Sequence, residues 1–351
     1  MCQGVFHPAV PLKSIPSLTA KLSVSRPCGG YPGNPVLTKD DVPYESALVF
    51  NAGVIRWQDG YAVVFRNDYG CTQREWEMGG RFKGTNIGLA FSRDGIHWKV
   101  EPDPIIEMKD EEILRAYDPR LTVIGDEVYM TFAVDSRHGL RGGIARTRDL
   151  RHFDLISLSA PDNRNMVLFP EKVGGMYLRL ERPMPVYSRG GVDRFDIWIS
   201  ESPDLIHWGR SELLAGVEDF PFANDKIGPG APPLKTDRGW LVFTHAVDRD
   251  ESRGKNGWEK KWTKRYCAGV MLLDLNDPYR VLGICRDPLL APDEAYESEE
   301  GFRTNVIFPT GSVLEKDGTV KIYYGASDTV IARATAKVDD LIEACLNTEQ
   351  E

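Results

Sequence analysis

The chain has 351 residues, of which 42% are hydrophobic and 27% are charged, a composition typical of a soluble globular protein. Its 43 basic and 52 acidic side chains give a formal net charge of −9, which argues against general binding to the phosphates of nucleic acids. No run of about 18 apolar residues predicts a transmembrane helix, and no apolar segment near the start predicts a signal peptide. We therefore expect a cytoplasmic protein that binds neither nucleic acid nor membrane.

The six cysteines are scattered along the chain and form no C-x-x-C pair. A metal site is therefore not expected, and a chain of this length does not need a disulfide framework. Reduced thiols in a cytoplasmic protein are the ordinary interpretation of such a pattern.

In chain order, residues 1–33 are interpreted as an N-terminal extension and residues 34–351 as a single domain. Five segments of that domain read as a strand, a tight turn and a second strand: residues 52–66, 120–133, 169–181, 231–245 and 311–327. Alternating apolar residues around DG, GD and GG turns are signals of β-hairpins. Only residues 338–346 predict a helix, with Asp339 or Asp340 as the N-cap.

A second pattern repeats between the hairpins. SRDGIHW (92–98), TRDLRHF (147–153) and SPDLIHW (202–208) place Asp94, Asp149 and Asp204 at intervals of 55 residues. Such a period is close to that of propeller blades. The pattern favours an all-β fold, a five-bladed β-propeller with a short C-terminal helix, over a β-sandwich or a β-helix. We interpret the three aspartates, and the histidines three residues after each, as structural turn residues.

Polar residues flank the strands of the predicted hairpins. Because the innermost strand of each blade lines the central channel, residues before the first strand and after the second should meet at one mouth. The residues at those places are Asn51, Arg66, Asp118, Arg164, Asn165, Lys226, His245, Asn305 and Asp328. Four potential cations with two carboxylates are costly to bury unless an anion completes the group, and arginine and lysine both bind phosphate well.

Seven segments stand in order along the chain: NPVLTKDDVP (34–43), VFNAG (49–53), YDPRLT (117–122), RNMVLFPEK (164–172), KIGPGAPP (226–233), LLDLNDP (272–278) and GASDTVIARA (325–334). Together they resemble glycoside hydrolase family 130, which contains the β-mannoside phosphorylases. The resemblance covers residues 34–346, nearly the whole chain. Ala52 stands where some members of the family carry a small hydroxyl residue.

The resemblance implies a five-bladed propeller that cleaves a β-mannoside with inorganic phosphate and with inversion, giving α-mannose 1-phosphate. It implies that Asp118 is the catalytic acid, acting through the 3-hydroxyl of the bound mannose. It implies that phosphate is bound by Arg66, Arg164, Asn165, Lys226, His245 and Tyr266. Sugar binding is assigned to Asn51, Tyr117 and Asp328 by resemblance, and Asn305 is added from its place at the mouth. Phosphate is then a co-substrate, no metal or organic cofactor is implied, and relatives form homo-oligomers.

Two other functions stay open at this stage. An inverting β-mannosidase would use water and would need a base as well as an acid, whereas a phosphorylase needs one acid and cations for its anionic nucleophile. A propeller that only binds glycans is the third interpretation. The acceptor sugar (glucose, N-acetylglucosamine or mannose) is not fixed. Two long loops, residues 67–85 and 247–266, carry tryptophans that either stack on this sugar or belong to surface loops or an oligomer contact, and the sequence leaves both interpretations open.

Overall fold

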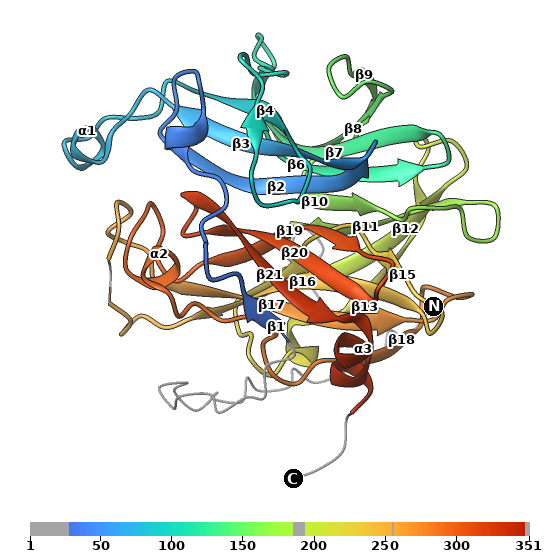
Figure 1. Ribbon diagram of the computed structural model, residues 1–351. Coiled ribbons are helices and arrows are strands. Elements are labelled where there is room, and N and C mark those ends of the chain that lie inside the picture. Colours follow the sequence, from blue (N-terminus) through green and yellow to red (C-terminus); the bar gives the residue numbers. More distant parts are fainter. Residues whose placement is uncertain (1–27, 185–193, 255, 348–351) are drawn as a thin grey trace, which may run out of the picture.

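Five antiparallel sheets make up the structure, a computed structural model that describes residues 28–184, 194–254 and 256–347 (Figure 1). The first sheet contains β2 (Leu48–Trp57), β3 (Gly60–Tyr69), β4 (Gly84–Ser92) and β5 (Lys99–Val100). The second contains β6 (Ile113–Ile124), β7 (Glu127–Ser136), β8 (Gly139–Thr147) and β9 (Asp154–Leu158). The third contains β10 (Asn163–Leu168), β11 (Tyr177–Pro183), β12 (Ile197–Ser202) and β13 (Gly209–Ala215).

The last two sheets follow the same plan. The fourth contains β14 (Lys226–Pro229), β15 (Leu234–Lys235), β16 (Trp240–Arg249), β17 (Lys264–Leu273) and β18 (Val281–Ile284). The fifth contains β19 (Ile307–Leu314), β20 (Thr319–Ala326), β21 (Val330–Lys337) and, at its outer edge, β1 (Cys28–Gly30). Most of the expected N-terminal extension, residues 1–27, lies outside the described residues. Residues 28–30, however, belong to the fifth sheet, where Cys28 pairs with Ala336.

The first strands of successive sheets are neighbours: β2 contacts β6, β6 contacts β10, β10 contacts β14, and β19 contacts β2. The ring is completed by β15 and β16, which contact β19. The predicted hairpins at residues 52–66, 120–133 and 311–327 lie on the first two strands of their sheets. Those at residues 169–181 and 231–245 begin too late, after β10 and β14 have ended. The five sheets confirm the prediction of a five-bladed β-propeller.

Helices are few among the described residues. They are α1 (Gln73–Glu77), α2 (Ala295–Ser298) and α3 (Val338–Leu346), with 3-10 turns at Lys39–Asp41 and Val217–Asp219. The bounds predicted for α3 are confirmed, but the predicted N-cap is wrong. Lys337 is the N-cap and makes no side-chain capping bond, while both aspartates lie in the first helical turn. The helix buries Leu341 and Ile342 against the edge of the fourth sheet, so packing rather than capping fixes its start.

The repeated Asp-x-x-His segments are turns that follow the third strand of the first three sheets. In each, the aspartate accepts backbone N–H bonds from the next residues and pairs with the exposed histidine, as between Asp94 Oδ2 and His97 Nδ1 at 2.7 Å. The same contacts recur at Asp149–His152 and Asp204–His207. The structural interpretation of these residues is confirmed by their place in the turns.

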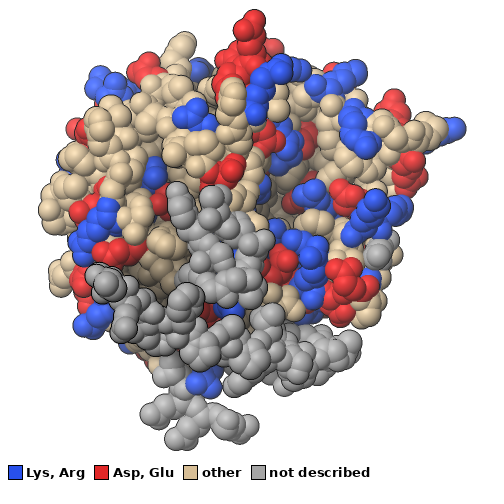
Figure 2. All heavy atoms as spheres, turned by 180° about the vertical axis from the view of Figure 1, so that it is seen from behind, with Lys and Arg blue, Asp and Glu red and all other residues tan. Residues whose placement is uncertain are grey.

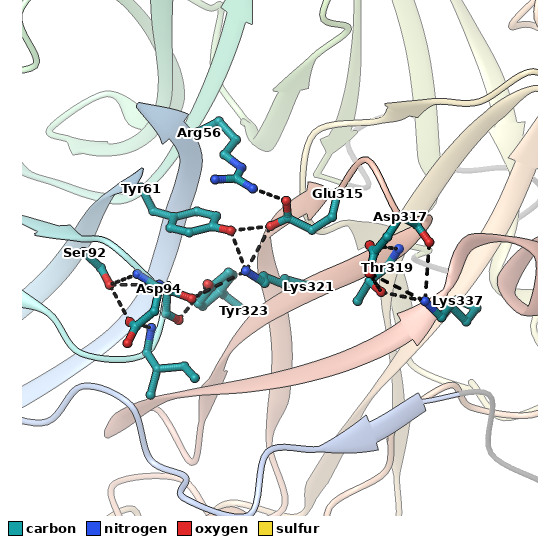
Figure 3. Close-up of polar contacts among 12 residues, drawn as sticks. Arg56, Tyr61, Ser92, Asp94, Glu315, Asp317, Thr319, Lys321, Tyr323 and Lys337 are labelled. Carbon is teal, nitrogen blue, oxygen red and sulfur yellow. Dashed lines mark hydrogen bonds and ion pairs between the residues drawn. The ribbon is translucent and has the colours of Figure 1, made fainter. Parts of the chain in front are cut away.

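A polar cluster joins the first sheet to the fifth, where the circle of sheets closes (Figure 3). Glu315 accepts hydrogen bonds from Arg56 and Tyr61, and it lies 3.0 Å from Lys321 Nζ. Lys321 also donates to the Tyr61 hydroxyl, and Tyr323 donates to the Gly95 carbonyl at 2.8 Å. A basic side chain of the first sheet, Arg56, thus pairs with an acidic side chain of the fifth, Glu315, where the two sheets meet.

Replacing Glu315 with Gln should lower the free energy of unfolding by about 1–3 kcal/mol, since a largely buried cation would lose its charged partner. Chemical denaturation followed by fluorescence measures this change. Lys337→Gln is the matched control, because Lys337 and its partner Asp317 are both well exposed and such pairs contribute little. Equal stability of the Glu315→Gln variant and the wild type would show that the cluster does not hold the two sheets together.

The surface carries charges of both signs. The face in Figure 2 shows basic and acidic side chains side by side rather than one continuous basic area. In the part of the chain that the structure describes, no helix has the length and apolar character needed to cross a membrane.

Candidate active site

Polar side chains share a common backbone distortion within the first half of three innermost strands and just before a fourth, β19. Asn51, Asp118, Asn165 and Asn305 have positive φ angles of 52°, 54°, 58° and 62°. In β2, β6 and β10 the strand register shifts across these residues. Asparagine and aspartate tolerate this left-handed conformation better than most other residues, which explains their use here. The bulge turns the side chain away from the regular strand alternation.

Asp118 is buried, with 2% of its surface exposed. Asn51 Nδ2 donates to Asp118 Oδ1 at 2.9 Å, and Arg66 Nη1 lies 3.4 Å from the same oxygen. Arg120 Nη1 donates to the backbone carbonyl of Asp118 at 2.9 Å. A side chain on Gly325 would put its Cβ 2.4 Å from Asn51 Oδ1, so glycine lets the fifth sheet approach this pair.

Opposing effects set the ionisation of Asp118. Burial by itself would raise the pKa of the carboxyl group. The guanidinium groups of Arg66, Arg120 and Arg164 outweigh burial, and they hold the pKa below its ordinary value. In this state Asp118 is a carboxylate.

Arg66 and Tyr117 lie beside Asp118 and have partners of their own. Arg66 forms two bonds to Asp68, from Nε at 2.9 Å and from Nη2 at 2.6 Å, so one predicted phosphate ligand is already paired with a carboxylate. Tyr117 donates from its hydroxyl to Asp135 Oδ1 at 2.7 Å, and burial raises its pKa to about 12.

A second group, the cation cluster, consists of Arg164, Arg182, Lys226 and His245. Arg182 Nη1 donates to His245 Nε2 at 3.1 Å. Because an arginine only donates, Nε2 is the acceptor and the proton of the neutral imidazole is on Nδ1. Tyr266 stacks on His245 with ring centroids 5.9 Å apart, and Lys226 Nζ lies 5.4 Å from the Tyr266 ring.

The cation cluster depends on a close approach of β14 to β16. Gly228 lies opposite His245 in the sheet. A Cβ at Gly228 would lie 2.4 Å from His245 Cε1 and 3.1 Å from Arg182 Cδ. Only glycine leaves room for both side chains at this point.

Burial and like charges act together on the cation cluster. Burial lowers the pKa of His245, and Arg182, Lys226, Arg120 and Arg164 lower it further. Burial also lowers the pKa of Lys226, with Arg182 as the next contributor, and it lowers the pKa of Arg182 to about 9. Mutual repulsion of buried cations is costly, and an anion among them would relieve it.

Several polar atoms of this region lack a hydrogen-bond partner among the described residues. They are Arg164 Nε, Arg182 Nε, His245 Nδ1, and both Oδ1 and Nδ2 of Asn165. Buried polar atoms are nearly always paired in folded proteins. The N–H groups among these atoms, on Arg164, Arg182, His245 and Asn165, therefore fit an anionic ligand with several acceptor oxygens, whereas Asn165 Oδ1 can only accept a hydrogen bond.

The predicted residues therefore gather in two groups. The structure places Asn51, Arg66, Tyr117 and Asp118 together, and Arg164 links them to the cation cluster, since its Nη1 lies 3.5 Å from the Tyr117 hydroxyl. Asn305 adjoins the cluster through its backbone, because its carbonyl accepts from Tyr266 N at 2.9 Å. Asp328 follows β20 and accepts from Arg303 Nη1 at 3.3 Å.

Sequence reasoning missed Arg120 and Arg182. Arg182 stands near the end of the second strand of its sheet, the place that singled out Arg66 and His245 in theirs. The predicted third hairpin ended at residue 181, one residue before it, whereas β11 continues to Pro183. Arg120 carried no such signal, because it reads as an ordinary residue of a strand.

The two long loops pack against each other. Trp76 contacts Phe302 with ring centroids 4.9 Å apart, and Trp258 lies 6.2 Å from Phe82. Trp76 and Trp258 thus belong to one hydrophobic cluster with Leu48, Phe50, Phe82 and Phe302. Trp262 instead stacks on Tyr266 at 5.7 Å, beside the cation cluster.

Comparison with known proteins gives a consistent result. The family model of glycoside hydrolase family 130, described as β-1,4-mannooligosaccharide phosphorylase, matches residues 23–347. A β-1,4-mannooligosaccharide phosphorylase of Ruminococcus albus is 33% identical over 328 residues, covering 89% of each chain. A β-1,2-mannobiose phosphorylase of Listeria innocua is 33% identical over 258 residues, covering 73% of this chain and 67% of the relative. The solved complex of Listeria innocua β-1,2-mannobiose phosphorylase with β-1,2-mannobiose has a TM-score of 0.76 and 27% identity, covering 91% of this chain and 99% of that one.

Proposed function

Since the chain belongs to glycoside hydrolase family 130, we propose that it is an inverting β-mannoside phosphorylase that releases α-mannose 1-phosphate. The observation that carries this proposal is the buried cation cluster, whose donors lack partners among the described residues, beside the buried carboxylate of Asp118. In the reaction, the glycosidic bond at C1 breaks and a phosphate oxygen bonds to C1. The leaving oxygen takes the proton that Asp118 supplies.

The cation cluster favours phosphate over water as the nucleophile. An inverting hydrolase needs a second carboxylate as base, roughly 6.5–9.5 Å from the acid. At the position where the nucleophile would be held, Arg164, Arg182, Lys226 and His245 offer positive or donating groups, which suit an anion. We assign Arg182 to the phosphate-binding group together with Arg66, Arg164, Asn165, Lys226, His245 and Tyr266. We assign Asn51, Tyr117, Asn305 and Asp328 to the sugar.

Phosphate binding should favour the protonated form of Asp118, which is the form that a general acid needs. The unliganded site keeps Asp118 ionised through nearby guanidinium groups, whereas a general acid must carry a proton. Phosphate beside the same groups offsets their attraction for the carboxylate, so the pKa of Asp118 should rise on binding. We expect wild-type protein to take up more protons on binding phosphate than Asp118→Asn does, measured by calorimetry in buffers of different ionisation enthalpy. Identical proton uptake in both proteins would contradict this coupling.

The acceptor sugar can be identified by the reverse reaction. The relatives named above act on β-1,4-linked and β-1,2-linked mannosides, so the linkage for this chain is still to be found. α-Mannose 1-phosphate should release phosphate only with the right acceptor among glucose, N-acetylglucosamine, mannose and mannobiose. Phosphate release with none of them, at any protein concentration, would argue against the proposed function.

We further propose a cytoplasmic location and a homo-oligomeric state for the protein. Cys71, Cys285 and Cys345 are free and buried in the part of the chain that the structure describes, which supports a reducing compartment such as the cytoplasm. The reaction as proposed requires no metal or organic cofactor. Assembly into a homo-oligomer stays a prediction, to be measured by light scattering.

A further inference from the structure

Arg303 connects a proposed sugar-binding residue to one of the long loops. It stands shortly before β19, and its Nη1 donates to Asp328 Oδ2 at 3.3 Å. Its Nη2 lies 3.8 Å from Glu259 Oε2, and its guanidinium lies over the Trp262 ring at 4.7 Å from the centroid. Both Glu259 and Trp262 belong to the loop of residues 247–266. One side chain thus contacts the fifth sheet and this loop together.

Asp328 needs such a partner because of where it lies. Its carboxylate is largely buried, with 14% of the side chain exposed, and its φ angle is 50°. Burial raises its pKa, Arg303 and Arg66 counter that rise, and Asp118 adds to it. Burial raises the pKa of Tyr266, and Asp328 in turn adds to that rise. Arg66 is already bonded to Asp68, so Arg303 is the cation most available to Asp328.

The contacts of Arg303 with the loop lie next to backbone hydrogen bonds that join the same loop to the residues before Arg303. Trp258 N donates to the Gly301 carbonyl at 3.1 Å, and Glu259 N donates to the Phe302 carbonyl at 3.0 Å. The segment Trp258–Trp262 is therefore fixed by backbone bonds to the two residues that precede Arg303. Trp262 then stacks on Tyr266, which contacts His245 of the cation cluster.

We propose that Arg303 is a positioning residue for the β-mannoside: it orients the Asp328 carboxylate, and it makes the position of Asp328 depend on the docked segment Trp258–Trp262. This inference rests on the proposed function, because it takes Asp328 as a group that binds the sugar. It also gives Trp262 a role other than stacking on the acceptor, since Arg303 and Tyr266 both already contact its ring.

The test compares Arg303→Met with Arg303→Lys. Methionine keeps much of the side-chain bulk and removes the charge, so the KM for the mannoside at pH 7 should rise about 10-fold, while the KM for phosphate changes little. Without Arg303 the pKa of Asp328 rises further. Because the ionised form is needed, the acid limb of the kcat/KM profile should move to higher pH. Lysine should restore part of both effects, and Glu259→Gln should raise the mannoside KM by a smaller factor.

Arg249→Met is the matched control, because Arg249 lies in the same loop and, among the described residues, its side chain forms an ion pair with exposed Glu251 alone. A readout independent of turnover is calorimetric binding of β-1,4-mannobiose and β-1,2-mannobiose, which should weaken in Arg303→Met and not in Arg249→Met. If Arg303→Met folds poorly, the comparison of Arg303→Lys with Glu259→Gln serves instead.

Three results would overturn the inference: an unmoved acid limb in Arg303→Met, equal losses in Arg303→Lys and Arg303→Met, or unchanged mannobiose binding. Failure of the proposed function would look different. In that case wild-type protein would show no phosphate-dependent turnover, whatever the behaviour of the variants.

Discussion

Asp118→Asn is expected to lower kcat for phosphorolysis by roughly 10²–10⁴-fold, the contribution typical of a positioned general acid. The amide keeps the size of the side chain and still accepts the bond from Asn51, but it cannot deliver a proton to the leaving oxygen. Arg66 retains its two bonds to Asp68, so the surroundings should hold their shape. Steady-state kinetics with saturating phosphate measures the change.

The loss should fall on kcat and not on phosphate affinity. Phosphate should still raise the melting temperature of Asp118→Asn, since the cation cluster is intact. Substrates with a good leaving group, which needs little protonation, should regain part of the lost rate. Turnover within a few-fold of wild type on ordinary β-mannosides would remove Asp118 from the role of acid.

Arg182→Met is expected to raise the KM for phosphate by about 10- to 100-fold, because a bond between two charged groups contributes about 1.5–3 kcal/mol. Removing this side chain should have the opposite effect on the unliganded fold. Arg182 is buried beside His245, Arg164 and Lys226 without a carboxylate partner among the described residues. Its removal relieves like-charge repulsion, so the melting temperature without phosphate should stay equal or rise.

The two effects together separate a binding role from a structural one. Phosphate should stabilise wild-type protein clearly and Arg182→Met much less, in thermal melts across a phosphate series. Arg238→Met is the control, because Arg238 is exposed in the turn before β16 and pairs with Glu343 on α3. An unchanged phosphate KM in Arg182→Met would exclude this residue from the binding group.

The propeller fold could be predicted because its turns and repeats depend on residues that are close together in the sequence. Turns such as those at Gly125 and Gly318 need positive φ angles of 62° and 78°, and glycine stands at both. The Asp-x-x-His turns repeat with nearly the same hydrogen bonds in three sheets. A propeller built from such units has a recognisable period, so both its class and its number of blades could be predicted.

The site could be predicted only in part, because the alternation of polar and apolar residues in the sequence does not reveal bulges or contacts between distant segments. The left-handed residue at Asp118 changes which side of the strand the next residues face, which is how Arg120 comes to be buried with 1% exposure. The pairing of Arg66 with Asp68 is different, because side chains two residues apart in a strand share a face; this signal was present in the sequence and was overlooked. Packing between loops distant in sequence, such as Trp258 near Phe82, leaves no local signal.

The most direct test of phosphorolysis is a product analysis of purified protein with a panel of β-mannosides, each with and without inorganic phosphate. The cation cluster beside Asp118 predicts mannose 1-phosphate of α configuration that appears only when phosphate is present, with little free mannose. Free mannose formed at the same rate with or without phosphate would contradict the account and identify a hydrolase.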